Sequence, residues 1–146
     1  MAATYNKFNC FVEDVLNGLH AFFDSAGDTL KVYLSNAAPS ATADFVIGDC
    51  AEIGAGNGYT AGGEDILQEC TRSGSTVTVT GNKIIWTAGP AAMNTFQYVV
   101  LYNPDSPSDS LVAWWDYLAG LALNAGETFT VKFNNGDPRG TVFTLA

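Results

Sequence analysis

The feature that most constrains the fold is a series of short segments, beginning near Thr29, in which apolar and polar residues alternate. Alternation with a period of two is typical of β-strands that bury one face. Glycine, proline, asparagine and aspartate separate the segments at the spacing of turns. About seven short strands at such spacing predict a mainly β fold, an antiparallel β-sandwich or jelly roll. The segments that we expect to form strands are 29–35, 76–80, 83–87, 96–102, 111–117, 128–133 and 141–145.

Turn signals within this series predict two hairpins. Gly81-Asn82 suits a two-residue hairpin turn between the second and third segments. Residues 134–140 are rich in Asn, Asp and Gly and separate the last two segments, which we also expect to pair. The apolar run 96–102 suits a central strand that is buried on both faces.

The N-terminal residues, from about 5 to 20, have a helical pattern instead. Apolar residues recur there at the spacing of one face of an amphipathic α-helix. One such helix cannot bury its face alone, so we expect it to cover an open face or edge of the sandwich. No repeat or linker divides the chain, so residues 1–146 are expected to form a single domain. The apolar residues of this pattern are Phe8, Phe11, Val12, Val15, Leu16 and Leu19.

The charge of the chain restricts its partners. It has a net charge of −9 over 146 residues, and no Lys or Arg lies between 43 and 71 or between 84 and 131. Nucleic-acid affinity comes largely from basic residues, so we expect no nucleic-acid partner. An anionic membrane is disfavoured for the same reason, and no apolar run approaches the ~20 residues that cross a bilayer. The N-terminus lacks the apolar region of a secretory signal, so we expect folding in a cytoplasm.

Few residues suit catalysis or metal binding. His20 is the only histidine, and at the end of the predicted helix it either caps the helix or lies on the surface. Cys10, Cys50 and Cys70 are an odd, widely spaced set, so we interpret them as reduced and mostly buried thiols. One histidine with three scattered cysteines makes a structural zinc site improbable.

Paired carboxylates could support glycoside hydrolysis, and two pairs are close in sequence. Glu64 and Asp65 are adjacent, so in an extended segment they point apart. Asp105 and Asp109 lie in a turn rich in proline and serine, where Asp bonds to its own backbone. We therefore expect no catalytic residue, no cofactor and no metal.

The glycine-rich stretch 54–63 has two possible roles. A phosphate-binding loop would open a helix and usually carry a lysine, whereas this stretch has no Lys or Arg and runs into two acids. Its glycines fit a surface loop with positive φ angles better. Tyr59, between Gly58 and Thr60, then either contacts another chain or folds back on its own core.

The tryptophan pair in the segment 111–117 raises a similar question. Neighbouring residues of a strand point to opposite faces, so one of Trp114 and Trp115 should fill the core. The other faces the helix, the solvent or a partner subunit. Aromatic residues are enriched where protein interfaces are strongest, which keeps a partner contact open.

Several phrases, taken in order, resemble a known family. The chain is similar, from residue 4 almost to its C-terminus, to small virion proteins of tailed bacteriophages that are called decoration or cement proteins. The cysteines are not part of that pattern. The phrases are 4–8 with 11–14, 28–32 with 35–39, 56–63, 98–103, 114–117 and 126–131.

This resemblance implies a non-enzymatic protein that binds and stabilises the outer surface of the major capsid protein lattice. It implies a homotrimer at or near local threefold axes, located in the virion on the outside of the capsid. The acidic charge agrees, since packaged DNA would repel it. We expect partner contacts at Tyr5, Phe8, Gly58, Tyr59, Thr60 and Trp115.

Other functions remain open at this point. The protein could be a tail, connector or fibre-associated virion protein, which its location in virions would distinguish. It could be a carbohydrate-binding sandwich module that stacks sugars on Trp115 or Tyr117. An enzyme would have to use His20.

Overall fold

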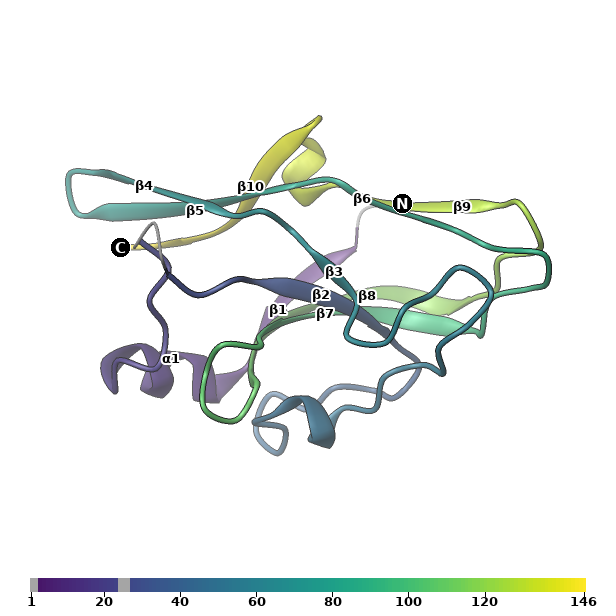
Figure 1. The fold of residues 1–146 in the computed structure, drawn as a ribbon. Coiled ribbons are helices and arrows are strands. Elements are labelled where there is room, and N and C mark those ends of the chain that lie inside the picture. The colour runs from purple at the N-terminus through teal and green to yellow at the C-terminus, as the bar shows by residue number, and fades with distance from the viewer. Residues whose placement is uncertain (1–2, 24–26) are drawn as a thin grey trace.

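The computed structural model describes residues 3–23 and 27–146, which fold into two facing β-layers (Figure 1). Its helical elements are α1 (Asn9–Leu16) and two short 3-10 turns, η1 (Ile47–Asp49) and η2 (Phe133–Asn135). The strands are β1 (Thr4–Lys7), β2 (Lys31–Ser35), β3 (Glu64–Asp65), β4 (Glu69–Ser73), β5 (Thr76–Asn82), β6 (Ile84–Thr87), β7 (Phe96–Asn103), β8 (Ser110–Leu121), β9 (Thr128–Val131) and β10 (Arg139–Leu145).

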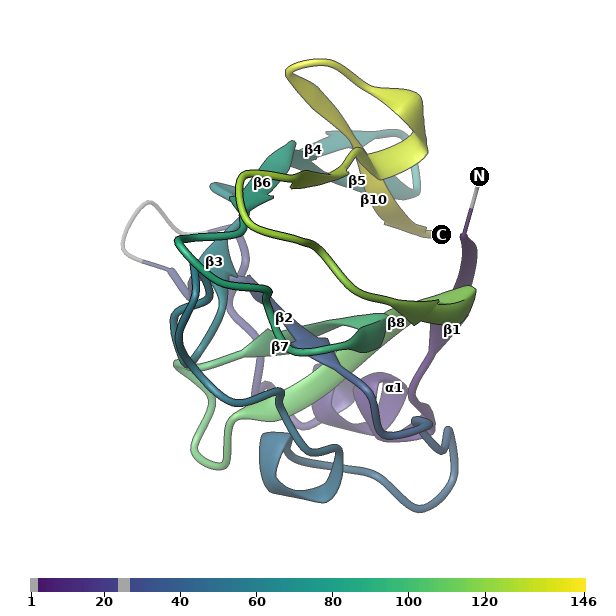
Figure 2. The same cartoon turned by 90° about the vertical axis from the view of Figure 1, so that its right-hand side faces the viewer.

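One layer is a five-stranded antiparallel sheet in the order β1-β8-β7-β2-β3. The other combines a three-stranded sheet, β10-β5-β4, with the pair β6-β9. Figure 2 shows the two layers facing each other, with the large sheet below. The prediction of a mainly β, antiparallel sandwich with an N-terminal helix is therefore confirmed.

Strand β7 lies at the centre of the large sheet, as its apolar run predicts. It pairs with β8 on one side and with β2 on the other. Val99, Val100 and Leu101 are all fully buried. A strand with neighbours on both edges and cover on both faces has few positions for polar residues, which explains its composition.

Both predicted hairpins are wrong, because the segments on either side of each expected turn pair with other strands. Gly81 and Asn82 are the last residues of β5, and β6 follows without reversing to pair with it. Gly81 lies opposite Gly140, and a Cβ on it would be 3.0 Å from the side chain of Ile66. This glycine therefore permits close packing instead of a turn.

The second layer is consequently a long, bent ribbon. β5 pairs with β10, β6 pairs with β9, and the Lys83 amide donates to the Pro138 carbonyl (2.7 Å) where the two pairs meet. The expected pairing of the last two segments fails for the same reason. β9 and β10 follow one another along the ribbon, and η2 forms the bend between them.

The N-terminal helix is shorter than predicted. Residues 4–7 form β1, whose Tyr5 lies opposite Trp115 of β8, and α1 begins at Asn9. Phe11 of the helix is fully buried and its ring centroid lies 5.4 Å from that of Phe143 in β10. The helix thus covers one end of the sandwich (Figure 1). No helix among the described residues is long and apolar enough to span a membrane.

Candidate partner-binding surfaces

Tyr59 anchors the glycine-rich loop to the core of its own chain. Its hydroxyl donates to Oε1 of Glu52 (2.5 Å) and accepts a hydrogen bond from the Leu34 amide (3.2 Å). The Gly62 amide donates to the same carboxylate oxygen (2.6 Å). The side chain is only 3% exposed. Of the two alternatives for Tyr59, the structure shows the fold-back, and the expected partner contact by its side chain is wrong.

The residues on either side of Tyr59 are exposed, but one of them has a local role. Gly58 has a φ of +94°, and a Cβ there would lie 1.9 Å from the Thr87 carbonyl oxygen. Its backbone therefore packs directly on the last residue of β6, which requires glycine. Thr60 is exposed and has no such constraint.

The two expected contacts in the N-terminal segment differ in accessibility. Phe8 is fully buried and packs on Trp114, with ring centroids 4.5 Å apart. Its side chain cannot reach a partner in this fold, because it is enclosed in the core. Tyr5 is 39% exposed and meets the half-buried Trp115 edge-on at 5.7 Å. The structure thus brings together Tyr5 and Trp115.

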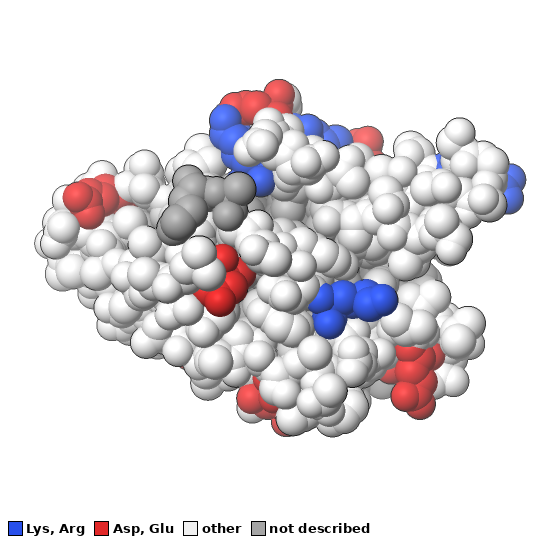
Figure 3. Space-filling model, turned by 180° about the vertical axis from the view of Figure 1, so that it is seen from behind, with Lys and Arg blue, Asp and Glu red and all other residues white. Residues whose placement is uncertain are grey.

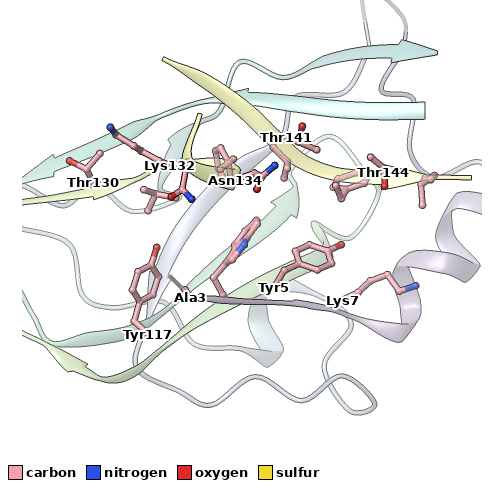
Figure 4. A pocket seen from close by; sticks show the side chains of 16 residues that line it. Ala3, Tyr5, Lys7, Tyr117, Thr130, Lys132, Asn134, Thr141 and Thr144 are labelled. Atoms are coloured by element: carbon pink, nitrogen blue, oxygen red, sulfur yellow. The ribbon is translucent and has the colours of Figure 1, made fainter. Parts of the chain in front are cut away.

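These two residues line a groove of about 720 Å³ on the side of the molecule where the layers are open. We call it the open-side groove. Figure 4 shows Tyr5 and Tyr117 pointing from the lower strands toward the upper layer, where Lys132 and Asn134 lie opposite them. Trp115 also contacts Phe133, with centroids 5.4 Å apart. The groove therefore has an aromatic floor and an upper wall that mixes polar and apolar side chains.

The charge of the upper wall is set by a small ion-pair cluster. Lys83 and Lys132 each place Nζ 2.7 Å from a carboxylate oxygen of Asp137. Hydrogen bonds from Lys132 and Lys83 lower the pKa of Asp137 to about 2. Two lysines face one carboxylate, so the cluster keeps one positive charge. This is unusual in a chain whose net charge is −9.

A second surface lies around α1. Val12, Val15, Leu16 and Phe23 are 46%, 36%, 84% and 59% exposed, and we call them the helix patch. Val15 and Phe23 border an apolar hollow of about 190 Å³, which Leu145 also lines. Val12 and Leu16 lie four residues apart and share one side of the helix. Exposed apolar side chains gathered around a hollow mark a protein-binding surface more often than they do a catalytic site.

His20 borders the same hollow but is not on the surface. Its side chain is 1% exposed and packs in a cluster with the rings of Phe11 (5.3 Å) and Phe22 (5.1 Å), which also contact each other. Nδ1 is 2.9 Å from the Asn103 amide nitrogen, and burial lowers the pKa of the imidazole, although Asp14 and Asp28 oppose the shift. The expected capping or exposed position is wrong, because the chain after α1 folds back and encloses the ring.

The cysteines are free, as expected. Cys10 and Cys50 are buried and Cys70 is half-buried. Burial raises the pKa of all three thiols, that of Cys10 to about 11. Within residues 3–23 and 27–146, no group of three or more His, Cys, Asp or Glu side chains is placed to hold a metal ion.

Sequence reasoning missed the helix patch and the lysines of the open-side groove. The predicted apolar stripe extends from Phe8 to Leu19, whereas α1 has 8 residues and buries Cys10 and Phe11. A stripe longer than the helix that carries it could have signalled exposed apolar residues. No local signal could place Lys132 opposite Tyr117, because the two strands meet only in the folded sandwich.

Comparison with protein families, with curated proteins and with solved structures finds no match to this chain. The resemblance to decoration proteins is therefore an expectation that rests on the sequence phrases. The function has to be argued from the helix patch, the open-side groove and the charge of the chain.

Proposed function

We propose that the protein is a non-enzymatic virion structural protein that decorates the outer surface of a phage capsid. The observation that carries the proposal is the helix patch. Leu16 exposes 84% and Phe23 exposes 59% of their surface at one end of the sandwich. An apolar patch beside a hollow is typical of a surface that binds another protein. A decoration protein needs such a surface to hold the capsid, whereas catalysis by itself does not require one.

The charge supports binding on the outside of the shell. A net charge of −9 would be repelled by packaged DNA on the inside. A protein that binds the assembled lattice but not the free subunits stabilises the shell by mass action. In this proposal the partner is the major capsid protein, and a homotrimer at local threefold axes would present three helix patches to it.

The test is co-sedimentation of the purified protein with capsids of its phage that lack it. The proposal predicts saturable binding at a fixed ratio to capsid subunits, and three copies per threefold site would support the trimer. No binding to capsids, with the protein present in whole virions, would favour a tail or connector protein. Absence from virions would reject the virion assignment.

A pair of matched variants tests the helix patch. Leu16→Asp places a charge on its most exposed member, and we expect capsid affinity to fall at least tenfold, about 1.4 kcal/mol. Stability should change little, because the side chain is 84% exposed. Ile85→Asp is the control, since Ile85 is also exposed (52%) but lies on β6. Equal binding by both variants would remove the patch from the interface.

A further inference from the structure

Two strand edges are free on the open side of the sandwich. β1 pairs with β8 alone, and β10 pairs with β5 alone, among the strands that the structure describes. Figure 2 shows both edges on the same side, close to the two chain ends. A free edge presents a row of backbone donors and acceptors that can pair with another strand, and natural proteins usually cover it.

The open-side groove lies between these two edges. Its lower wall carries Tyr5 and Trp115, and its upper wall carries Thr141 and Asn134 (Figure 4). At about 720 Å³ the groove has room for an extended chain segment. Aromatic side chains beneath and polar groups above suit a strand whose successive side chains alternate in direction.

The charge of the groove selects among possible occupants. The chain has 15 Asp and Glu residues and 6 Lys and Arg residues, yet Lys7 and Lys132 line the groove and no acidic residue does. Lys7 has no ion-pair partner among the described residues, and the Lys83–Lys132–Asp137 cluster keeps one positive charge. Figure 3 shows basic side chains on both layers of this face. An acidic occupant is therefore favoured in an otherwise acidic protein.

We propose that the open-side groove binds an extended, acidic segment of a partner protein, which adds to the edge of β1 as a further strand. Main-chain hydrogen bonds to β1 supply affinity, and carboxylates of the segment pair with Lys7 and Lys132. The proposal goes beyond the proposed function, because it concerns a different surface from the helix patch. If the capsid assignment holds, the segment belongs to the capsid protein.

A sugar is a poorer occupant of the same groove. Carbohydrate sites use an aromatic ring with a free face, whereas Trp115 contacts both Tyr5 and Phe133. Tyr117 meets Phe129 edge-on at 5.1 Å. Free strand edges offer nothing particular to a sugar but match a peptide backbone.

The experiment selects peptides that bind the whole protein from a displayed random heptapeptide library. NMR then maps where the selected peptides bind. We expect enrichment of peptides that contain Asp or Glu between β-branched residues. Their binding should shift the amide signals of β1 and protect edge amides from hydrogen exchange, which a purely electrostatic contact would not do. Lys7→Glu should weaken binding about fivefold or more. Arg72→Glu, an equal charge reversal on β4, should not.

Several outcomes would overturn the proposal. The first is a selection that enriches no acidic peptides, and the second is peptide binding that maps away from β1. The third is an equal loss of peptide affinity in both variants. The fourth is specific binding of glycans, in place of peptides, at the groove. Self-association through β1, visible as a concentration-dependent mass, would replace the partner segment by a second copy. Capsid co-sedimentation separates this inference from the proposed function. If the protein binds capsids but selects no peptides, only the inference about the groove is rejected. If it selects peptides but does not bind capsids, only the proposed function is rejected.

Discussion

Single residues decide the shape of the glycine-rich loop. One carboxylate oxygen of Glu52 accepts hydrogen bonds from both the Tyr59 hydroxyl and the Gly62 amide, and these two hydrogen bonds close the loop over the core. Gly63, with a φ of +68°, would place a Cβ 1.9 Å from the Val32 carbonyl oxygen, so the loop also lies directly on β2. The glycines therefore permit close backbone contact, and the loop is a packed part of the fold.

Gly58 gives the sharpest test of this view. Gly58→Ala would force a Cβ against the Thr87 carbonyl oxygen at 1.9 Å, so the backbone has to move. Gly56→Ala is the matched control, because Gly56 also has a positive φ (+123°) but no atom within 4 Å of the added carbon. We expect Gly58→Ala to lower the free energy of unfolding by about 1–3 kcal/mol more than the control does, measured by urea unfolding. Equal losses of stability in the two variants would mean that the strain of a positive φ alone accounts for the requirement for glycine at both positions.

At the scale of elements, local patterns predict which segments become strands but not which strands pair. The alternation that identifies β5, β9 and β10 depends only on burial of one face, so the sequence contains it. Pairing depends on contacts between distant segments. Gly81-Asn82 has the composition of a hairpin turn, yet its glycine lies inside a paired strand and packs closely against Ile66. The same residue type serves both purposes, so the sequence alone cannot distinguish them.

The N-terminal segment shows a similar limit. Residues 4–7 fit the start of the helical stripe, but they form β1 because Tyr5 packs on Trp115, more than 100 residues away. Sequence reasoning identified Tyr5 and Trp115 as accessible aromatics, although not that they meet. It named Phe8 both in the apolar face of the predicted helix and among the partner contacts, whereas Phe8 is fully buried against Trp114.

The stability of the fold should depend on pH through His20, which lies in the connection after α1. Burial lowers the pKa of His20 below 6.5, its ordinary value, so the unfolded chain binds a proton at a higher pH than the folded chain does. The free energy of unfolding should therefore fall as the pH drops from 6.5 through the folded pKa, and level off below it. As His20 is the only histidine, an NMR titration of its ring reports the folded pKa directly.

A variant separates this effect from the titration of the acids. His20→Phe keeps an aromatic ring packed against Phe11 and Phe22 but removes the titrating group. We expect it to abolish the change in stability just below pH 6.5 while leaving the loss at lower pH, which comes from carboxylates. A ring pKa at or above 6.5, or an unchanged stability profile in the variant, would contradict the buried position of His20.

At the scale of the whole molecule, the two candidate surfaces differ in character. The helix patch is apolar and lies at one end of the sandwich, whereas the open-side groove mixes aromatic, apolar and basic side chains and is bounded by free strand edges. Composition, with only 14% charged residues, favours a chain that covers part of its surface with a partner. It could not locate that surface, because exposure depends on where the helix ends and on how the second layer bends.

The three thiols can test whether the two layers unfold as one unit. Cys10 (7% exposed) lies on α1 and Cys50 (1% exposed) packs against the large sheet, while Cys70 lies on β4 in the second layer. A single domain predicts that Cys10 and Cys50 react with a thiol reagent only through global unfolding, with the same dependence on urea. Cys70, which is half-buried, should react faster in the native state. Measurement by mass spectrometry resolves the three sites. Cys10 could instead react through a local opening that costs less free energy than global unfolding, while Cys50 does not. In that case α1 would unfold separately from the rest of the domain, and the helix patch would lie on a movable helix.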